Sequence, residues 1–365
     1  MDILPPIIIL GLVLLIHLTF VNINIGLGFY SVILRYASLK KSTLGVLAYR
    51  VFKFTVATEV VSGVYGTMIT VILAGLFPTL VNIAATILFI PLIISVLGIL
   101  IRLTSIVAYW YTWDRVNPRI HLFIGVLMAS SGLMIPGGFR YIFALIDNPV
   151  GVSSLTPLAG DPVKALYNPI YPPLLLHTWF GALSIGFLAA ATGLMWKENE
   201  EAITWSRYAS LLGSLMIIPQ GIVGFWFWST LGFHSKHLFN SINRSFLPIG
   251  ESSTDVGVTF LGMVLLAIAI LVMGVAYYYQ PKKKIIYITT SLAIVSMILG
   301  EITHDVGRLP YMVIIGESGL DVSLFINRLI IIEPALLIVG IASILVMTSI
   351  FMMLLYRYLV KGFIE

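Results

Sequence analysis

The stretch PIIILGLVLLIHLTFVNINIGLGFYSVILR, residues 6–35, decides the fold. It contains no lysine, arginine, aspartate or glutamate before Arg35, and it exceeds the ~20 residues that a helix needs to cross the hydrocarbon core of a bilayer. A run of this length and hydrophobicity is typical of a transmembrane helix. His17 lies well inside it, and an ionisable side chain at that depth costs enough free energy to require a structural or functional reason.

The composition extends this conclusion to the whole chain. Hydrophobic residues make up 59%, charged residues only 10%, and the mean hydropathy is +1.02. A water-soluble domain has roughly 25% charged residues, so lipid must surround most of these side chains. The net charge of +5 does not indicate nucleic acid, because the basic residues lie in short segments between apolar runs.

Apolar runs bounded by charges or by Pro, Gly and Asn predict an all-α membrane bundle of about nine transmembrane helices. We treat residues 1–365 as a single membrane domain, since no boundary or internal repeat interrupts the pattern. The expected spans are residues 6–35, 50–77, 80–112, 119–146, 171–196, 205–231, 257–279, 285–304 and 328–356.

The basic residues predict a multi-pass membrane protein with its N-terminus outside, and we expect the membrane to be a prokaryotic plasma membrane. In that orientation most of the 21 lysines and arginines fall on the cytoplasmic side. The cytoplasmic set is Arg35, Lys40, Lys41, Arg50, Lys53, Arg115, Arg119, Lys197, Arg207, Lys282, Lys283, Lys284, Arg357 and Lys361; the outer set is Lys164, Lys236, Arg244 and Arg308, with Arg328 at the outer edge of the last span. The longer outer connections, 147–170, 232–256 and 305–327, are where we expect function outside the membrane.

The chain has no cysteine, which excludes disulfides, thiolate metal sites, Fe–S clusters and covalently attached c-type haem. Histidines, methionines and carboxylates remain as ligands. The ionisable residues expected within spans are His17, Glu59, Arg102, Arg140 and His177, with Glu301, His304 and Asp305 at the outer end of the eighth span.

Two deep histidines, His17 and His177, suit axial ligation of haem iron in a helical bundle. On the residues alone, two alternatives stay open: a histidine that hydrogen-bonds a neighbouring helix, or a proton relay in a carrier. Glycines follow both, Gly26 after His17 and Gly186 after His177. Small residues admit a flat macrocycle or a close helix contact equally well.

The densest polar cluster is residues 300–311, GEITHDVGRLPY. Arg308 could pair with a haem propionate, because its planar fork matches a carboxylate. The alternative is a charged helix end, with Pro310 starting the turn. His234 and His237 lie in an outer connection, where we expect them to be solvated, and Met263 could ligate haem but methionines usually pack.

Four stretches together resemble subunit I of the cytochrome bd-type quinol oxidases. They are His17-Leu18-Thr19-Phe20-Val21 followed by Gly26; Trp113-Asp114-Arg115 with His121; His177-Thr178; and Gly307-Arg308-Leu309-Pro310-Tyr311. They occur in the family's order, and the family's nine spans and outside N-terminus also agree.

The resemblance implies b-type haem, haem d if the oxygen-reducing pair is intact, and quinol as substrate. His17 would hold a haem of that pair, Asp305 would stand at its second ligand position, and His177 would hold the low-spin haem. Arg308 would support propionates, and His121, Glu301 and His304 would be further cofactor contacts. The outer connection 232–256 would form the quinol site through Lys236, Arg244 and Glu251. A second membrane subunit, resembling subunit II or a paralogue of this chain, would be the partner.

The sequence also departs from the family. Ile94 and Arg102 stand where the family has two glutamates of the third span, and Glu301 stands where it has a tryptophan. Val258 occupies the slot of the low-spin haem's methionine, with Met263 five residues later. The connection 232–256 is shorter than usual. Glu59 and Arg102 are then the candidate catalytic residues of a proton route.

Two interpretations follow from the resemblance. In the first, the chain is a haem-bearing subunit that passes electrons from quinol to an oxygen-reducing haem site. In the second, it is a degenerate paralogue that lacks one or more haems and acts as a partner or electron-transfer subunit. A proton-coupled carrier is a third hypothesis, which the lack of paired Gly/Pro-broken spans disfavours.

Overall fold

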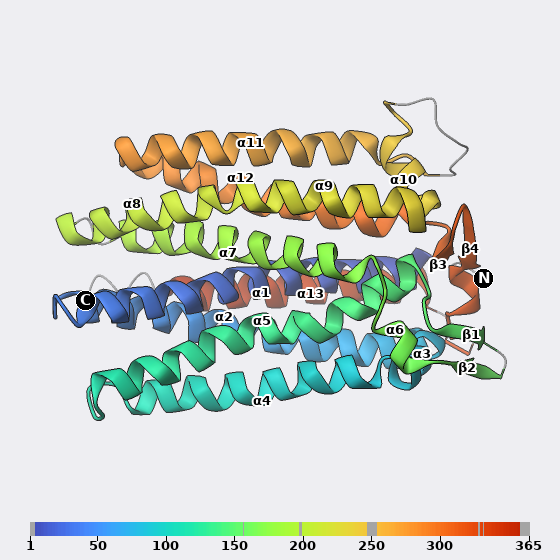
Figure 1. Cartoon of the computed structure of the whole chain (residues 1–365), viewed down its shortest axis with the longest axis horizontal. Coiled ribbons are helices and arrows are strands. Elements are labelled where there is room, and N and C mark those ends of the chain that lie inside the picture. The colour runs from blue at the N-terminus through green and yellow to red at the C-terminus, as the bar shows by residue number, and fades with distance from the viewer. Residues whose placement is uncertain are drawn as a thin grey trace.

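The structure, a computed structural model, describes residues 4–155, 157–196, 199–246, 254–327, 329–330 and 332–357. Within these residues nine helices are long and apolar enough to cross a membrane. They are α1 (Leu4–Ser38), α2 (Leu44–Leu76), α4 (Phe89–Tyr111), α5 (Pro118–Asp147), α7 (Tyr171–Met195), the successive helices α8 and α9 that together make one span (Glu200–Leu215 and Ile217–His234), α11 (Gly257–Tyr279), α12 (Lys283–Gly307) and α13 (Pro334–Tyr356). The predicted all-α membrane bundle is confirmed, and its helices run alongside one another in Figure 1.

Two expected spans are broken rather than continuous. The third begins with a separate short helix, α3 (Pro78–Ile87), and is interrupted at Leu88; the sixth is interrupted at Met216. Pro91 and Pro219 lie three residues after these breaks. Proline has no backbone N–H, so it cannot donate to the last carbonyl of the preceding helix, and the ladder stops there.

The outer connections carry structure of their own. Two antiparallel hairpins form, β1 (Val152–Leu155) with β2 (Leu158–Gly160) and β3 (Tyr311–Ile315) with β4 (Ser318–Asp321). The remaining elements there are α6 (Pro162–Ala165), α10 (Lys236–Asn243) and the 3₁₀ helix η1 (Val322–Leu324). Figure 1 places both hairpins, α6 and α10 at the same end of the bundle as the N-terminus.

A close helix contact joins α1 to α7 at two glycines. A Cβ atom built on Gly26 would lie 2.5 Å from the Cα of Gly186, and one built on Gly186 would lie 2.3 Å from the Cα of Gly26. Without a hydrophobic driving force between helices in lipid, such small residues permit the close backbone packing that holds them together. At these two positions the glycines therefore serve helix packing.

Candidate functional site

Both deep histidines turn Nδ1 toward a backbone carbonyl of a neighbouring helix. His17 Nδ1 lies 2.9 Å from the carbonyl oxygen of Ser62 on α2, and His177 Nδ1 lies 3.2 Å from that of Gln220 on α9. A carbonyl only accepts, so Nδ1 must carry the proton and Nε2 keeps its lone pair. Among the described residues neither Nε2 has a hydrogen-bond partner. This is the tautomer and orientation that metal-ligating histidines adopt.

Glycines lie against both imidazole rings. A Cβ atom on Gly66 of α2 would lie 3.0 Å from Cε1 of His17, and one on Gly224 of α9 would lie 3.1 Å from Cε1 of His177. A side chain at either position would crowd the ring. The two sites are thus built alike, each with a carbonyl and a glycine on one partner helix.

Arg102, which stands where the resembled family has a glutamate, is buried, and each of its three side-chain nitrogens has a partner. Its Nε lies 2.7 Å from Oε2 of Glu59, its Nη1 donates to the carbonyl of Met128 at 2.7 Å, and its Nη2 donates to Oδ1 of Asn24. The side chain is 2% exposed and that of Glu59 is 19% exposed. The two predicted catalytic residues therefore form one ion pair across α2 and α4.

The ion pair lies close to the His17 site along α2. The Ser62 hydroxyl donates to the carbonyl of Glu59 at 3.0 Å, and the Ser62 carbonyl faces His17. With the N-terminus outside, α2 runs outward from the cytoplasm, so Glu59 lies on the cytoplasmic side of Ser62 and His17. The Oε1 atom of Glu59 has no hydrogen-bond partner among the described residues.

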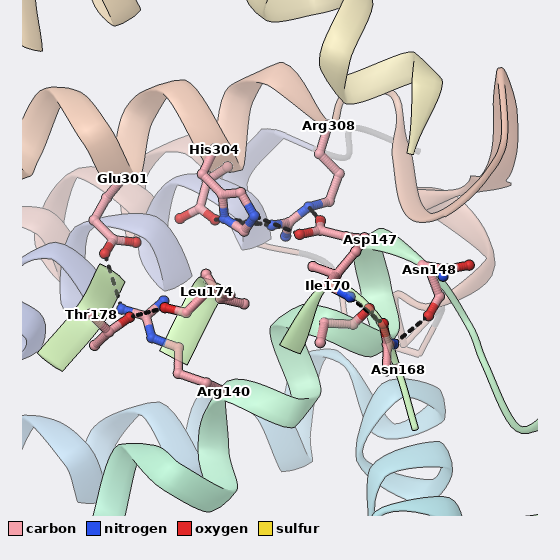
Figure 2. A network of polar contacts seen from close by, with 12 residues as sticks. Arg140, Asp147, Asn148, Asn168, Ile170, Leu174, Thr178, Glu301, His304 and Arg308 are labelled. Carbon is pink, nitrogen blue, oxygen red and sulfur yellow. Dashed lines mark hydrogen bonds and ion pairs between the residues drawn. The ribbon is translucent and has the colours of Figure 1, made fainter. Parts of the chain in front are cut away.

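A second ionic cluster joins α5 to α12 at the outer end (Figure 2). The carboxylate of Asp147, which is fully buried, lies 2.7 Å from Nε2 of His304 and 3.4 Å from Nε of Arg308. Arg308 also donates from Nη2 to Nδ1 of His304 at 3.0 Å. Because an arginine can only donate, Nδ1 accepts and Nε2 donates to Asp147. Both nitrogens of His304 therefore have partners within the protein, and the predicted cofactor contact at His304 stays a prediction.

Asp147 is the residue that sequence reasoning missed. It is the last residue of α5, one position beyond the expected span, and its partners lie more than 150 positions away on α12. An acidic residue directly after an apolar run was the available signal. Asp305, the predicted haem-ligand position, lies at the edge of the cluster, with Oδ1 3.5 Å from Nη2 of Arg308 and a side chain that is 28% exposed.

Glu301, another predicted cofactor contact, pairs instead with Arg140 of α5. The distance from Arg140 Nη2 to Glu301 Oε1 is 3.3 Å, and both side chains are nearly buried. Figure 2 shows Arg140 reaching from α5 toward Glu301 across the space between the helices. The guanidinium also lies over the ring of Phe143, 4.8 Å from its centroid.

His121 of α5 is hydrogen-bonded to residues of α1 and α4 at the end of the bundle that the sequence predicts to be cytoplasmic. Its Nδ1 accepts from Nε of Arg35 at 3.2 Å, and its Nε2 donates to the carbonyl of Tyr109 at 3.0 Å. Arg35 also pairs with Asp114 at 3.1 Å and lies over the Trp113 ring. Both ring nitrogens of His121 therefore have partners within the protein, and the cofactor contact there stays a prediction.

The outer connection 232–256 contains α10, which turns one face into the protein. His237 is buried, and its Nε2 donates to the carbonyl of Leu309 at 3.0 Å. Burial lowers the pKa of His237. The expectation of a solvated loop is correct for the exposed His234 and wrong for His237, because a helix forms here and packs against β3.

The predicted quinol contacts and the candidate haem methionine, Met263, do not form one cluster in the described part of the chain. Lys236 pairs with Glu317 of the β3–β4 turn at 3.2 Å, and Arg244 is exposed directly after α10. Glu251 lies outside the described residues, as do Lys197, Arg328 and Lys361. Met263 packs its sulfur against Gly300 of α12, where a Cβ would lie 3.1 Å away. Val258, in the family's methionine slot, is 73% exposed.

Comparison with known proteins gives one family and one fold. The family model of the cytochrome bd terminal oxidase subunit I matches residues 8–232. The bd oxidase from Geobacillus thermodenitrificans superposes with a TM-score of 0.82 at 17% sequence identity, covering 98% of this chain and 99% of that chain. No curated protein matches the sequence significantly. Since the family match spans more than half of the chain, this protein belongs to the cytochrome bd terminal oxidase subunit I family, as a multi-pass, haem-binding oxidoreductase subunit of the membrane.

Proposed function

We propose that this chain is the haem-bearing catalytic subunit of a membrane quinol oxidase. Two quinols release four electrons and four protons, and dioxygen takes up four electrons and four protons to give two waters. The observation that carries the proposal is the matched geometry of His17 and His177, each with a protonated Nδ1 held by a carbonyl and an unpaired Nε2.

These residues fit haem. His177 would hold a low-spin haem b, and His17 would hold a haem of the oxygen-reducing pair, of which one member is haem d. The iron supplies reversible electron exchange and, at an open coordination position, a site for dioxygen. The protein's own part is to fix both imidazoles in the required tautomer and to keep them away from bulk water.

Asp305 and Arg308 would complete the outer side of this site. Asp305 stands at the second ligand position, and its carboxylate is the most exposed group of the cluster. The Nη1 atom of Arg308 has no hydrogen-bond partner among the described residues, so it can bind a propionate.

Glu59 is the proposed last carboxylate of the cytoplasmic proton route. It lies on the cytoplasmic side of His17, and its Oε1 is free to accept a proton while Oε2 stays bound to Arg102. Arg102 is then a positioning residue that orients Glu59. Protons that enter from the cytoplasm, while quinol protons leave on the outer side, would separate charge across the membrane.

A second membrane subunit is the proposed partner. The last helix, α13, is the least buried of the nine spans in the described chain. Its contact to the rest of the protein includes the hydrogen bond between Tyr65 and Thr348, at 2.5 Å, and the buried Ile344. Met347, Phe351 and Leu355 pack beside them, and most other side chains of this helix are exposed, where lipid or a neighbouring subunit would contact them.

The second interpretation, a degenerate paralogue that lacks one or more haems and acts as a partner or electron-transfer subunit, draws support from the outer cluster. Arg308, His304 and Asp147 pair with one another within the chain, as a structural ion network would, although Asp147 Oδ1 and Arg308 Nε lie 3.4 Å apart without a hydrogen bond. A pyridine-haemochrome assay on the purified complex separates the two interpretations, because it counts haems per chain.

Single-histidine variants then assign the haems. We expect His177→Ala to abolish the low-spin haem b bands of the dithionite-reduced spectrum and His17→Ala to abolish the bands of the oxygen-reducing haem. His234→Ala, at an exposed histidine, is the matched control and should leave the spectrum unchanged. Loss of one haem with His177→Ala, together with no effect of His17→Ala, would favour the second interpretation. A purified protein without Soret absorption would refute the haem-bearing catalytic subunit and leave only a partner subunit without haem.

A further inference from the structure

Arg140 of α5 is a buried arginine that uses one of its three side-chain nitrogens. Its side chain is 8% exposed, and Nη2 lies 3.3 Å from Oε1 of Glu301. Nε and Nη1 have no hydrogen-bond partner among the described residues. Arg102, which is also buried, has a partner for each of its three nitrogens. A guanidinium has five N–H donors and keeps its charge, so unpaired donors at this position in a membrane protein cost free energy.

The contacts that Arg140 does make are weak. Its distance to Glu301 exceeds the ~2.7–2.9 Å of a strong charge-assisted hydrogen bond, whereas Arg102 and Glu59 are 2.7 Å apart. The ring of Phe143, 4.8 Å away, attracts the positive charge but offers no oxygen to the N–H groups. The edge formed by Nε and Nη1 is therefore left for another acceptor. A carboxylate matches that edge, because its two oxygens fit the planar fork of an arginine.

The helices place Arg140 at the depth of the His177 site. Arg140 lies seven residues before the end of α5, His177 lies six residues after the start of α7, and Glu301 lies six residues before the end of α12. With a rise of ~1.5 Å per residue, all three are roughly 9–11 Å from the outer ends of their helices. Figure 2 shows the guanidinium turned from α5 toward α7 and α12.

Arg140 also acts electrostatically on His177. Arg140 and His304 are the two charged groups close enough for their charges to affect the His177 imidazole. His304 is bound to Asp147 and Arg308, so its ring nitrogens are occupied, whereas Arg140 retains free donors. A haem extends well beyond its axial imidazole and carries its two carboxylates at its edge. A cation near the imidazole is thus placed to meet the edge of the macrocycle.

We propose that Arg140 binds a propionate of the haem that His177 holds, and that Glu301 orients the guanidinium for this contact. This inference rests on the proposed function, since it requires a haem at His177. The propionate accepts from Nε and Nη1 while Nη2 stays with Glu301. Arg140 is then a cofactor-binding residue on α5, separate from Arg308 on α12, and Glu301 is a positioning residue.

The pair also sets the reduction potential of that haem, with opposite signs. Reduced haem carries one positive charge fewer than oxidised haem, so a nearby cation favours reduction and a nearby anion opposes it. These effects are strong where water is excluded, because the local dielectric constant is low. Arg140 therefore raises the reduction potential of the haem at His177, and Glu301 lowers it.

The test compares Arg140→Gln, Glu301→Gln and the double variant in the intact purified complex. For Arg140→Gln we expect a shifted propionate bending band in the resonance Raman spectrum of the low-spin haem and a lower reduction potential. Haem transfer to apomyoglobin should accelerate roughly tenfold to a hundredfold, as loss of a hydrogen bond to a charged group would. Glu301→Gln should raise the potential. Lys164→Gln, at an exposed lysine on the outer side, is the control and should change none of these.

The double variant distinguishes haem binding from simple charge neutralisation, and it avoids leaving Glu301 unpaired where Arg140→Gln alone fails to assemble. If Arg140 binds the propionate, the double variant releases haem as fast as Arg140→Gln. If Arg140 only neutralises Glu301, the double variant retains haem like the unaltered protein, which would overturn the inference.

The remaining outcomes separate this inference from the proposed function. An unchanged propionate band in Arg140→Gln, or a change confined to the oxygen-reducing haem, would overturn the inference and leave the proposed function intact. Missing haem bands in the unaltered protein would refute the proposed function, and this inference with it.

Discussion

The Glu59–Arg102 ion pair gives the sharpest prediction, because it is buried in the membrane and each partner can be removed separately. Arg102 is 2% exposed and makes three side-chain contacts, to Glu59, Asn24 and Met128. Breaking a buried pair by removing one partner costs about 3–5 kcal/mol, because an uncompensated charge stays buried. Glu59 is 19% exposed, so we expect the lower end of this range for Glu59→Gln and for Arg102→Met.

The double variant tests the pair directly. When both charges are removed, no unpaired ion remains, and replacing a buried pair with residues of similar volume is often close to neutral. Asn24 and Met128 still lose their donor, so we expect the double variant to lose about 1–2 kcal/mol. The sum of the two single losses would then exceed the double loss by several kcal/mol, as is typical of side chains in direct contact.

Unfolding in mixed micelles with increasing dodecyl sulfate, followed by tryptophan fluorescence, provides the free energies. The chain has seven tryptophans and no cysteine, so intrinsic fluorescence is usable whereas thiol-reactive dyes are not. Thr104→Val, an exposed change on α4, is the control. Single losses that simply add in the double variant would refute the ion pair and with it the orientation of Glu59 by Arg102.

Three further predictions concern the rest of the bundle. Asp147→Asn should destabilise the protein by about 3 kcal/mol or more in the same unfolding assay, because Arg308 loses its fully buried counter-ion. Gly186→Val should be destabilised by ~1–3 kcal/mol or fail to assemble, because its Cβ would overlap Gly26, and size-exclusion chromatography will report it. Burial lowers the pKa of His237, so the folded state favours the neutral imidazole. The stability that the buried, neutral imidazole contributes is therefore present above pH ~6.5, the pKa of an unperturbed histidine, and is lost as the pH falls below that value. Limited proteolysis near α10 should therefore accelerate in acid, and His237→Gln should remove that acceleration.

The spans were predictable because lipid imposes one simple rule on the sequence. The range 257–279 coincides with α11, and the other spans differ mainly at their ends. The breaks at Leu88 and Met216 were not predicted, although Pro91 and Pro219 signal them. Hydropathy measures how apolar a segment is, and a proline changes that measure little while it removes a backbone donor.

The site was predictable as a set of residues and not as a set of pairs. Sequence reasoning selected Glu59 and Arg102 separately, but it could not know that helix packing places them 2.7 Å apart. His304 was selected as a cofactor contact, whereas its partner Asp147 was missed. Side-chain pairs between α5 and α12 depend on how two helices rotate against each other, and no local pattern encodes that rotation.

Two of the departures from the family, Arg102 and Glu301, are explained by these pairs. Arg102 brings a positive charge into a span, and Glu59 neutralises it; Glu301 brings a negative charge, and Arg140 neutralises it. Because an unpaired ion in the membrane is costly, each unusual residue is tolerable only with its partner. The same reasoning singles out His17 and His177, which lie within membrane-spanning helices and whose Nε2 atoms have no partner among the described residues. We therefore propose that these two lone pairs, left free while the other ionisable groups named here are paired, bind a metal such as haem iron.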